Sequence, residues 1–382
     1  MKFNKAYKFR LYPTKKQKEY LEGCFSACRY VYNVSLDCEK QLYELGAKSN
    51  LSAFGLAYHL KYYKISEPWL KDYDHRALEF EMENLASSFQ KFFKGGGFPR
   101  FKSKKDRKQS FRTRKSISLL ENSIKIPKIK TTIECVVHRK IEGVIKQFTI
   151  SRENDKYYVS VMTEIQKNFA PREIKKEVGI DLGVKSFLTR DDGIKVENPQ
   201  FLSQEAIHMS KLQQAFSRAK KGSNNHAKLR KKIADLHERI SNKRNDFLHN
   251  ESAKLINEFD RIYMEDLNVA GMTRSSKGTA EKPGKNVKQK SGLNRNILDV
   301  GLGNFKNMIE YKTNFNNKEV VKVNRFFASS KTCHKCGTKN DELKLSDRVW
   351  ICSSCGEELD RDENAAKNIK AEGRRSLTLI KK

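Results

Sequence analysis

Three acidic residues stand where the neighbouring sequence favours apolar or small side chains. Asp181 lies inside the apolar run VGIDLGV, Glu265 ends the run RIYM, and Asp362 lies in LDRDENAAKNI. A buried carboxylate is costly unless it is paired or metal-bound, and several carboxylates together repel until one holds a proton. Mg²⁺ relieves this conflict because it prefers hard oxygen ligands. Two such ions about 3.5–4 Å apart can activate water and stabilise the leaving oxygen of a phosphodiester.

Each acid also has a purely structural interpretation. Asp181 could cap a turn at a strand end, and Glu265 could simply bound a strand. Asp360 and Asp362 precede a helical sequence that begins at Glu363, where caps and the helix dipole favour carboxylates. The acids therefore indicate a metal site only when they are taken together, and with the features described below.

Four cysteines form two CxxC pairs, Cys333 with Cys336 and Cys352 with Cys355. Each CxxC turn places two thiolates on one side of a knuckle, and two knuckles complete the tetrahedral four-sulfur set that suits Zn²⁺. Gly337 and Gly356 follow the pairs, where a knuckle needs unusual backbone angles. Disulfides or a redox CxxC are the alternatives, which the doubled motif disfavours. The predicted zinc is structural, because four protein ligands leave no open position, and His334 is expected to be a spacer.

The elements that position these residues begin with a β-module in the first 170 residues. Residues 5–12 alternate like a strand, and Thr14 with Gln17 forms a capping box that opens a helix. A second helix is expected at about 75–94, and short antiparallel strands are expected between 117 and 163. The helices are therefore inserted between the first strand and the others.

The segment at residues 98–115, FPRFKSKKDRKQSFRTRK, interleaves aromatic and basic side chains. Its rings could stack on bases while its cations neutralise phosphates; the alternative is a solvated loop that its phenylalanines anchor to the core. The residues concerned are Phe98, Phe101, Phe111, Arg100, Lys102, Lys104, Lys105 and Arg107.

An α/β unit is predicted from about Glu177 onward. Strands with a hairpin at Asp191-Asp192-Gly193 precede a basic helical region at 203–257, which is broken at 222–225. A strand at 260–268, a mobile loop at 274–292, a helix at 297–315 and a further strand follow. The basic helices at 211–245 suit a nucleic-acid backbone, or form a solvated face.

Composition points to a polyanionic partner. The 382 residues include 77 lysines and arginines against 46 acids, a net charge of +31, which favours nucleic acid. This length exceeds one ordinary core, so two or three domains are expected. No apolar window approaches the ~18 residues of a membrane span, and the start lacks a signal-peptide run. A cytoplasmic, nucleoid-associated protein with no membrane partner is expected.

Taken in order, these motifs resemble the TnpB family, transposon-encoded proteins related to type V CRISPR effectors. The segments that carry the resemblance are GIDLGVKSF, IYMEDLNVAGM, SSKTCHKCG, LSDRVWICSSCG, LDRDENAAKNI, KAYKFRLYPT, FPRFKSKK and RISNKRNDFLH. They extend over nearly the whole chain, and the ordered set is far more specific than any single motif.

The resemblance implies an α/β plus β-module fold with an RNase H-like (RuvC) nuclease domain that brings the three acids together. At the matching positions, Asp181, Glu265 and Asp362 are the catalytic acids and the ligands of two Mg²⁺ ions, with Mn²⁺ as a substitute. Asp360 competes for the third role, but the family's acid stands two residues before an asparagine, here Asn364. Arg348 matches a recurrent family arginine that contacts the scissile strand or plays a structural part.

The implied domains follow one another along the chain. A β-barrel-like wedge domain spans 1–170 and carries a helical recognition insert at about 14–95. The first part of the nuclease domain spans 171–332, a zinc ribbon is inserted at 333–356, and the last nuclease part spans 357–372. A flexible tail is expected at 373–382.

The implied function is an RNA-guided, magnesium-dependent DNA endonuclease. A transposon-derived guide RNA would direct one protein to double-stranded DNA beside a short motif, and both strands would be cut. A guided repressor or transposition regulator without cleavage is the alternative, although such relatives would be expected to lose acids. A transposase is disfavoured because the chain lacks a His-hydrophobe-His motif, and a zinc-ribbon RNA-binding protein would not need Asp181 and Glu265.

Overall fold

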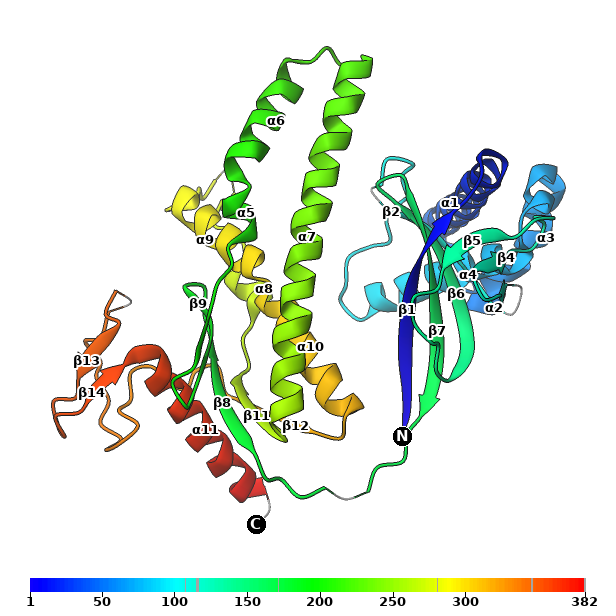
Figure 1. Ribbon diagram of the computed structural model, residues 1–382. Coiled ribbons are helices and arrows are strands. Elements are labelled where there is room, and N and C mark those ends of the chain that lie inside the picture. Colours follow the sequence, from blue (N-terminus) through cyan, green and yellow to red (C-terminus); the bar gives the residue numbers. More distant parts are fainter. Residues whose placement is uncertain (107, 115–116, 171, 280, 345, 381–382) are drawn as a thin grey trace. The chain divides into compact units, whose positions relative to one another are not determined.

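The computed structural model describes all residues except 107, 115–116, 171, 280, 345 and 381–382. The chain forms two compact units, Met1–Asn168 and Phe169–Lys382, and each has its own hydrophobic core (Figure 1).

Unit 1 is built on a seven-stranded antiparallel sheet with the order β2-β6-β7-β1-β5-β4-β3. Strand β1 pairs with β7 along almost its whole length, from Lys2 opposite Gln166 to Leu11 opposite Tyr157. The strands are β1 (Lys2–Tyr12), β2 (Lys108–Thr113), β3 (Ser118–Leu119), β4 (Ser123–Lys125), β5 (Ile133–Val136), β6 (Val144–Glu153) and β7 (Lys156–Gln166).

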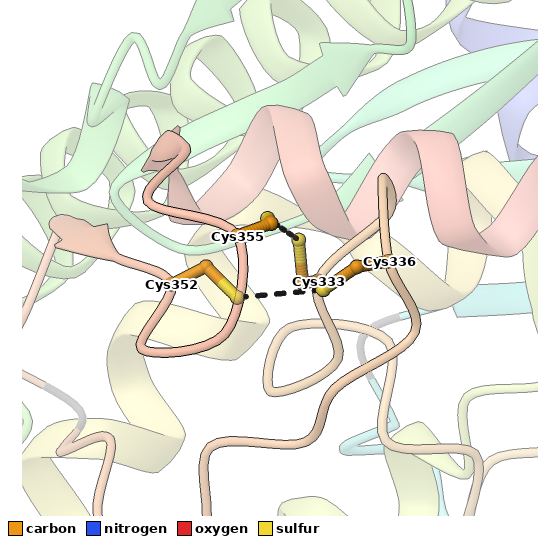
Figure 2. Close-up of side chains that lie close together, drawn as sticks. All are labelled: Cys333, Cys336, Cys352 and Cys355. Carbon is orange, nitrogen blue, oxygen red and sulfur yellow. Dashed lines mark hydrogen bonds between the residues drawn. The ribbon is translucent and has the colours of Figure 1, made fainter.

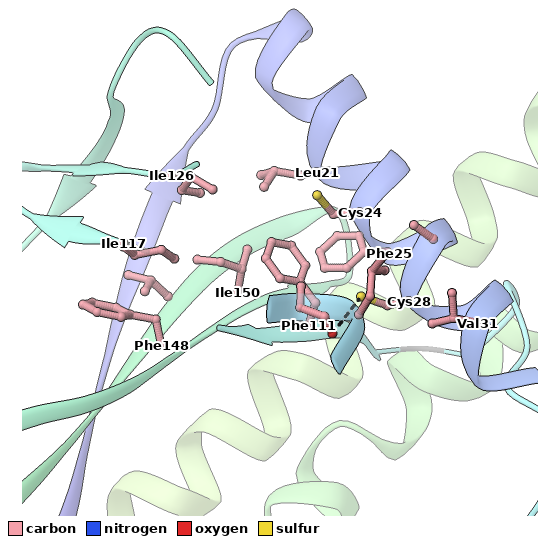
Figure 3. Packing of buried hydrophobic residues seen from close by; sticks show 14 of the residues in the cluster. Leu21, Cys24, Phe25, Cys28, Val31, Phe111, Ile117, Ile126, Phe148 and Ile150 are labelled. Carbon is pink, nitrogen blue, oxygen red and sulfur yellow. Dashed lines mark hydrogen bonds between the residues drawn. The ribbon is translucent and has the colours of Figure 1, made fainter. Parts of the chain in front are cut away.

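The helices of unit 1 lie between β1 and β2 in the chain, as the sequence predicts. They are α1 (Lys15–Glu44), α2 (Ala53–Tyr58), α3 (Leu60–Ser66), the short 3₁₀ helix η1 (Pro68–Asp72) and α4 (His75–Phe93). The capping box is present: the Thr14 amide donates to Gln17 Oε1 at 2.9 Å, and the Gln17 amide donates to Thr14 Oγ1 at 3.4 Å. One apolar face of α1 packs onto the sheet (Figure 3).

The second half of the aromatic and basic segment is a strand rather than a loop. β2 pairs with β6, and Phe111 is 1% exposed between the sheet and Phe25 of α1 (Figure 3). Phe111 therefore anchors the core and cannot stack on a base. Arg107 and Lys115 lie outside the described residues.

Unit 2 contains a five-stranded mixed sheet with the order β10-β9-β8-β11-β12. The strands are β8 (Glu177–Leu182), β9 (Ser186–Arg190), β10 (Lys195–Glu197), β11 (Arg261–Glu265) and β12 (Glu319–Val323). β9 runs antiparallel to both of its neighbours, β8 and β10, whereas β11 is parallel to both β8 and β12. The predicted hairpin is confirmed, with Gly193 in the left-handed region at φ 85°.

The helices of unit 2 are α5 (Phe201–Gln204), α6 (Ala206–Arg218), α7 (Asn224–Glu258), α8 (Val269–Met272), α9 (Val287–Val300), α10 (Leu302–Phe315) and α11 (Arg361–Ile380). The predicted break at 222–225 separates α6 from α7, which lie side by side in Figure 1. The helix expected at 297–315 is instead two helices, because Gly301 adopts φ 76° between them. Part of the loop expected at 274–292 is already helical from Val287.

The sheet of unit 2 is covered on both faces. Val178, Ile180 and Met264 pack with side chains of α7 and α10, whereas Tyr263 packs on the opposite face with Ile369 of α11. Helix α11 approaches so closely that a Cβ on Gly179 would stand 2.3 Å from the Ala366 carbonyl oxygen. A glycine in β8 is therefore required by the helix that covers it.

The end of the chain is helical where a flexible tail was expected. Residues 373–380 continue α11, and Gly373 packs against Tyr263, where a Cβ would stand 2.2 Å from the ring. The Arg374 guanidinium donates twice to Glu177 Oε2, at 2.8 and 2.5 Å. The contact between Arg374 and Glu177 spans 197 positions of sequence, which is why local composition did not reveal it.

A small two-stranded sheet, β13 (Val349–Ile351) with β14 (Glu358–Asp360), leads into α11. Throughout the described parts of the chain, no helix combines the length and apolar character that crossing a membrane requires.

Candidate functional site

The strand register brings two of the predicted acids together at one edge of the sheet. Met264 of β11 pairs with Ile180 of β8 in parallel, and Glu265 and Asp181 are the next residues of these neighbouring strands. Because side chains alternate along a strand, Asp181 shares the face of Gly179, and Glu265 shares the face of Tyr263. Both glycine and tyrosine contact α11. The two carboxylates therefore lie on the α11 face.

Helix α11 supplies the third acid on that face. Asp362 stands in its first turn, and the remainder of the helix packs over β8 and β11. Elements that are remote in sequence thus place Asp181, Glu265 and Asp362 in one neighbourhood.

The electrostatics of this neighbourhood favour a bound cation. Burial, with the nearby Glu265 and Asp362 carboxylates, raises the pKa of Asp181 from 3.8 to about 7. Burial also raises the pKa of Glu265, although the Ser329 hydroxyl opposes that shift. A divalent cation would offset both the lost hydration and the mutual repulsion. Among the described residues, the four cysteines form a group whose ligand atoms all lie within 4.8 Å of one another, and the three carboxylates are not part of such a group.

The raised pKa of Asp181 predicts an effect on stability in the absence of divalent cations. The native state binds the Asp181 proton more tightly than the unfolded chain, so the contribution to stability is present at low pH and is lost as pH rises through about 7. At pH 8, Asp181→Asn should therefore raise the free energy of unfolding by about 4 kcal/mol, and the gain should shrink toward pH 4. Urea unfolding at several pH values measures this difference. Equal stabilities of the two proteins at pH 8 would contradict it.

Neighbouring acids already have partners among the described residues. Asp266 contacts Lys306 at 2.5 Å and Arg325 at 2.8 Å, and these cations lower its pKa. Asp360 Oδ1 accepts from the Asp362 and Glu363 amides at 3.1 and 3.0 Å, as a helix cap does. Its Oδ2 accepts from Lys195 at 2.6 Å. Asp360 thus has the contacts of a helix cap, with a lysine as a further partner.

Arg348 lies beside the third acid. Its guanidinium is 3.6 Å from Asp362 Oδ1, and its carbonyl accepts from the Arg361 amide at 2.8 Å. The side chain is 43% exposed, which leaves it accessible to a nucleic-acid strand as well as to Asp362. Both interpretations of Arg348 are compatible with this position.

The four cysteines converge, and the sulfur atoms face one another in Figure 2. Cys333 Sγ is 3.7 Å from Cys355 Sγ, and Cys336 Sγ is 3.5 Å from Cys352 Sγ. Hydrogen bonding with Thr338 lowers the pKa of Cys336 to about 6, which favours the thiolate that a metal binds. The donor set fits a tetrahedral Zn²⁺ site.

The two knuckles repeat one backbone pattern. In the first, the Gly337 amide donates to the Cys333 carbonyl at 2.9 Å; in the second, the Gly356 amide donates to the Cys352 carbonyl, also at 2.9 Å. Both glycines are left-handed, at φ 80° and 72°, as the sequence predicts. His334 is not one of the converging side chains; its ring contacts Asn364 at 3.1 Å.

The predicted nucleic-acid residues of unit 1 differ in how available they are. Arg100, Lys104 and Lys105 are exposed. The Lys102 ammonium instead pairs with Glu81, which is 2% exposed, and lies over the Tyr32 ring at 4.4 Å. Lys102 therefore neutralises a buried acid, and its prediction as a phosphate contact conflicts with this partner.

Sequence reasoning gave no contact role to three residues of the site, although it used Asn364 to place Asp362. Ser329 donates to Glu265 Oε1 at 2.6 Å, and Asn364 and Asn368 bond the segment that precedes Cys333. The serine has no local signal, because it lies 64 positions from Glu265. The two asparagines could have been found from their spacing, since they stand four residues apart in α11 and so lie on one helix face.

Three family models match parts of the chain. A model described as a probable transposase matches residues 160–276, and a Cas12f1-like TNB domain matches residues 303–369. A model described as a helix-turn-helix domain matches residues 1–48. In this structure those residues form one strand and one long helix.

Full-length relatives and a solved structure agree with these matches. The "Putative RNA-guided DNA endonuclease InsQ" of Escherichia coli is 33% identical over 98% of this chain and 93% of its own length. A "Putative RNA-guided DNA endonuclease" of Streptomyces pristinaespiralis is 32% identical, over 97% and 89%. The protein in a cryo-EM structure of a Cas12f1-sgRNA-target DNA complex shares the fold, with a TM-score of 0.55 and 15% identity over 94% of this chain and 83% of that chain. By its motifs and by its near full-length relatives, this chain belongs to the TnpB family.

Proposed function

We propose that this protein is an RNA-guided DNA endonuclease with a RuvC-like site formed by Asp181, Glu265 and Asp362. The observation that carries the proposal is the placement of these acids on one face of the sheet by β8, β11 and α11. A mixed sheet in which three antiparallel strands are followed by two parallel ones supports an RNase H-like fold. The names of the full-length relatives support the same activity.

The three carboxylates would hold divalent metal ions, Mg²⁺ or Mn²⁺. When bound, such ions activate water and stabilise the leaving oxygen of a phosphodiester. The chain's own part is to hold the ligands: two neighbouring strands fix Asp181 and Glu265, and the capped first turn of α11 fixes Asp362. Burial and the neighbouring carboxylates raise the pKa of Asp181, which supports a cation-binding role for this donor set.

A structural Zn²⁺ ion would be held by Cys333, Cys336, Cys352 and Cys355. All four ligands come from the chain, so this ion takes no part in hydrolysis. Arg348, which lies between the two cysteine pairs in sequence, would contact the strand that is cut.

The partners would be a transposon-derived guide RNA and double-stranded target DNA. Helices α6 and α7 pack on each other through Met209, Leu236 and Ile240. The two helices and the turn between them carry exposed cations: Lys211, Arg218, Lys220, Lys221, Lys228, Arg230, Lys231, Lys232 and Arg239. Such a surface suits a phosphate backbone, while guide pairing would read the sequence and unit 1 would serve as the wedge and recognition part.

The two acids that begin α11 separate the catalytic interpretation from the structural one. Asp362→Asn should lower target cleavage by about a thousandfold or more, because it removes a metal ligand. Asp360→Asn should cleave within about tenfold of wild type, because asparagine caps a helix as well as aspartate does. Cleavage rates of the two variants, each loaded with guide RNA, measure the difference. The assignment fails if the Asp360 variant is inactive while the Asp362 variant cuts normally.

A further inference from the structure

The Glu265 carboxylate is held by a residue outside its own strand. Ser329 follows β12, is 6% exposed, and donates its hydroxyl to Glu265 Oε1 at 2.6 Å. A hydrogen bond to one carboxylate oxygen fixes the rotation of the side chain and so the direction of the other oxygen. The orientation of Glu265 thus depends on where Ser329 is placed.

Ser329 is itself fixed to α11 through its backbone. The Asn368 side-chain amide donates to the carbonyls of Ser329 and Thr332, at 2.8 and 2.5 Å. One turn earlier, the Asn364 amide donates to the same Thr332 carbonyl at 2.8 Å. Both asparagines are buried, at 6% and 1% exposure, so these bonds are protected from water.

Asn364 also holds the first zinc knuckle. Asn364 Oδ1 accepts from the backbone amide of His334 at 2.9 Å, and His334 directly follows Cys333. The segment from Ser329 to His334 is therefore bonded to α11 at both of its ends. The segment adds its own turn, in which the Thr332 amide donates to the Ala328 carbonyl at 3.2 Å.

From these contacts we infer that Ser329 is a positioning residue for Glu265, and that the zinc knuckle holds it in place through Asn364 and Asn368. The inference rests on the proposed metal site. It gives the zinc ribbon a second task besides any contact with nucleic acid, which is to orient a ligand of the nuclease site. In this arrangement the knuckle at Cys333 is bonded to α11, α11 is bonded to the Ser329 backbone, and the Ser329 hydroxyl orients Glu265.

Metal binding tests this inference independently of cleavage. Mn²⁺ binding to the complex of protein, guide RNA and target DNA can be followed by electron paramagnetic resonance. Ser329→Ala should weaken Mn²⁺ binding by about tenfold or more, which is typical when a partner of a metal ligand is removed. Ser329→Thr keeps the hydroxyl and should bind within about threefold of wild type.

Ser252→Ala is the matched control. Ser252 is equally buried in unit 2, but its hydroxyl donates to the Leu248 carbonyl of α7, away from the acids. This variant should bind Mn²⁺ as wild type does. If Ser329→Ala does not fold, Ser329→Cys replaces it, since cysteine is similar in size and a weaker donor.

The outcomes of the Mn²⁺ experiment distinguish the positioning role of Ser329 from the proposed nuclease function. A wild-type complex that cleaves DNA, beside a Ser329→Ala complex that binds Mn²⁺ within twofold of it, overturns the positioning role alone. A wild-type complex that neither cleaves nor binds Mn²⁺ contradicts both the proposed function and this inference. Weakened Mn²⁺ binding that threonine restores supports the positioning role.

Discussion

Asp181→Ala should abolish cleavage of guide-matched DNA and leave guide-RNA binding within about twofold of wild type. The residue sits between Glu265 on the next strand and Asp362 on α11, so its loss would remove the central ligand of the metal site. A fall of at least a thousandfold is expected, equivalent to about 4 kcal/mol of transition-state stabilisation. Single-turnover cleavage and RNA filter binding, made on one preparation, measure the two effects.

Asp192→Asn is the control for that variant. Asp192 lies in the turn between β9 and β10, is 45% exposed and pairs with Arg190. Its substitution therefore removes the same charge as Asp181→Ala without changing one of the three acids. Asp192→Asn should cleave at nearly the wild-type rate. Retained cleavage in Asp181→Ala, or loss of RNA binding in that variant, would contradict a purely catalytic role for Asp181.

Cys333→Ala should release zinc, unfold the ribbon and lower cleavage by at least about a hundredfold. Among the described residues of the ribbon, the core consists of five side chains, Cys333, Leu343, Trp350, Cys352 and Leu359. So small a core cannot support a fold without a metal, whose binding supplies free energy of folding. Zinc content by mass spectrometry, and hydrogen exchange across residues 330–360, measure the loss.

Cys38→Ala removes a thiol from unit 1, remote in sequence from the two CxxC pairs, and should keep both zinc and activity. The structural role of zinc would be contradicted if Cys333→Ala lost its metal and the ribbon amides stayed as protected as in wild type. It would also be contradicted if the purified wild-type protein contained no zinc.

Local sequence signals predicted the features whose causes are local. The capping box of α1 depends on two residues three apart, and each zinc knuckle depends on a CxxC followed by a left-handed glycine. The hairpin at Gly193 and the break between α6 and α7 have equally local causes. All of these are visible in windows of a few residues.

Features that depend on distant partners were missed. The sequence left open whether Phe111 stacks on bases or anchors the core, and the pairing of β2 with β6, which buries it, was not predicted. The final helical turns looked like a loose tail, but Gly373 fits against Tyr263 and Arg374 binds Glu177. Lys102 looked like a phosphate contact, but Glu81 supplies a buried partner. In each case a contact with a residue distant in sequence determines how the side chain is buried or paired.

The acids of the candidate site were only partly predictable from local sequence. The sequence singles out Asp181, Glu265 and Asp362 as acids in unusual surroundings, and the resemblance to the TnpB family orders them. The resemblance also favours Asp362 over Asp360, and the structure adds the capping bonds and the Lys195 contact of Asp360, which the sequence did not reveal. Ser329 could not be found from its own neighbours at all.

The proposed activity of this protein is cleavage of DNA that its bound RNA selects. The direct measurement is to purify it with co-expressed RNA from the flank of its gene, sequence the bound RNA, and add Mg²⁺ with plasmids. The plasmids carry the matching target beside a randomised flank. We predict that matched plasmids with one short flanking motif are cut on both strands and that mismatched plasmids stay intact. Matched plasmids that remain intact beside every flank would contradict it.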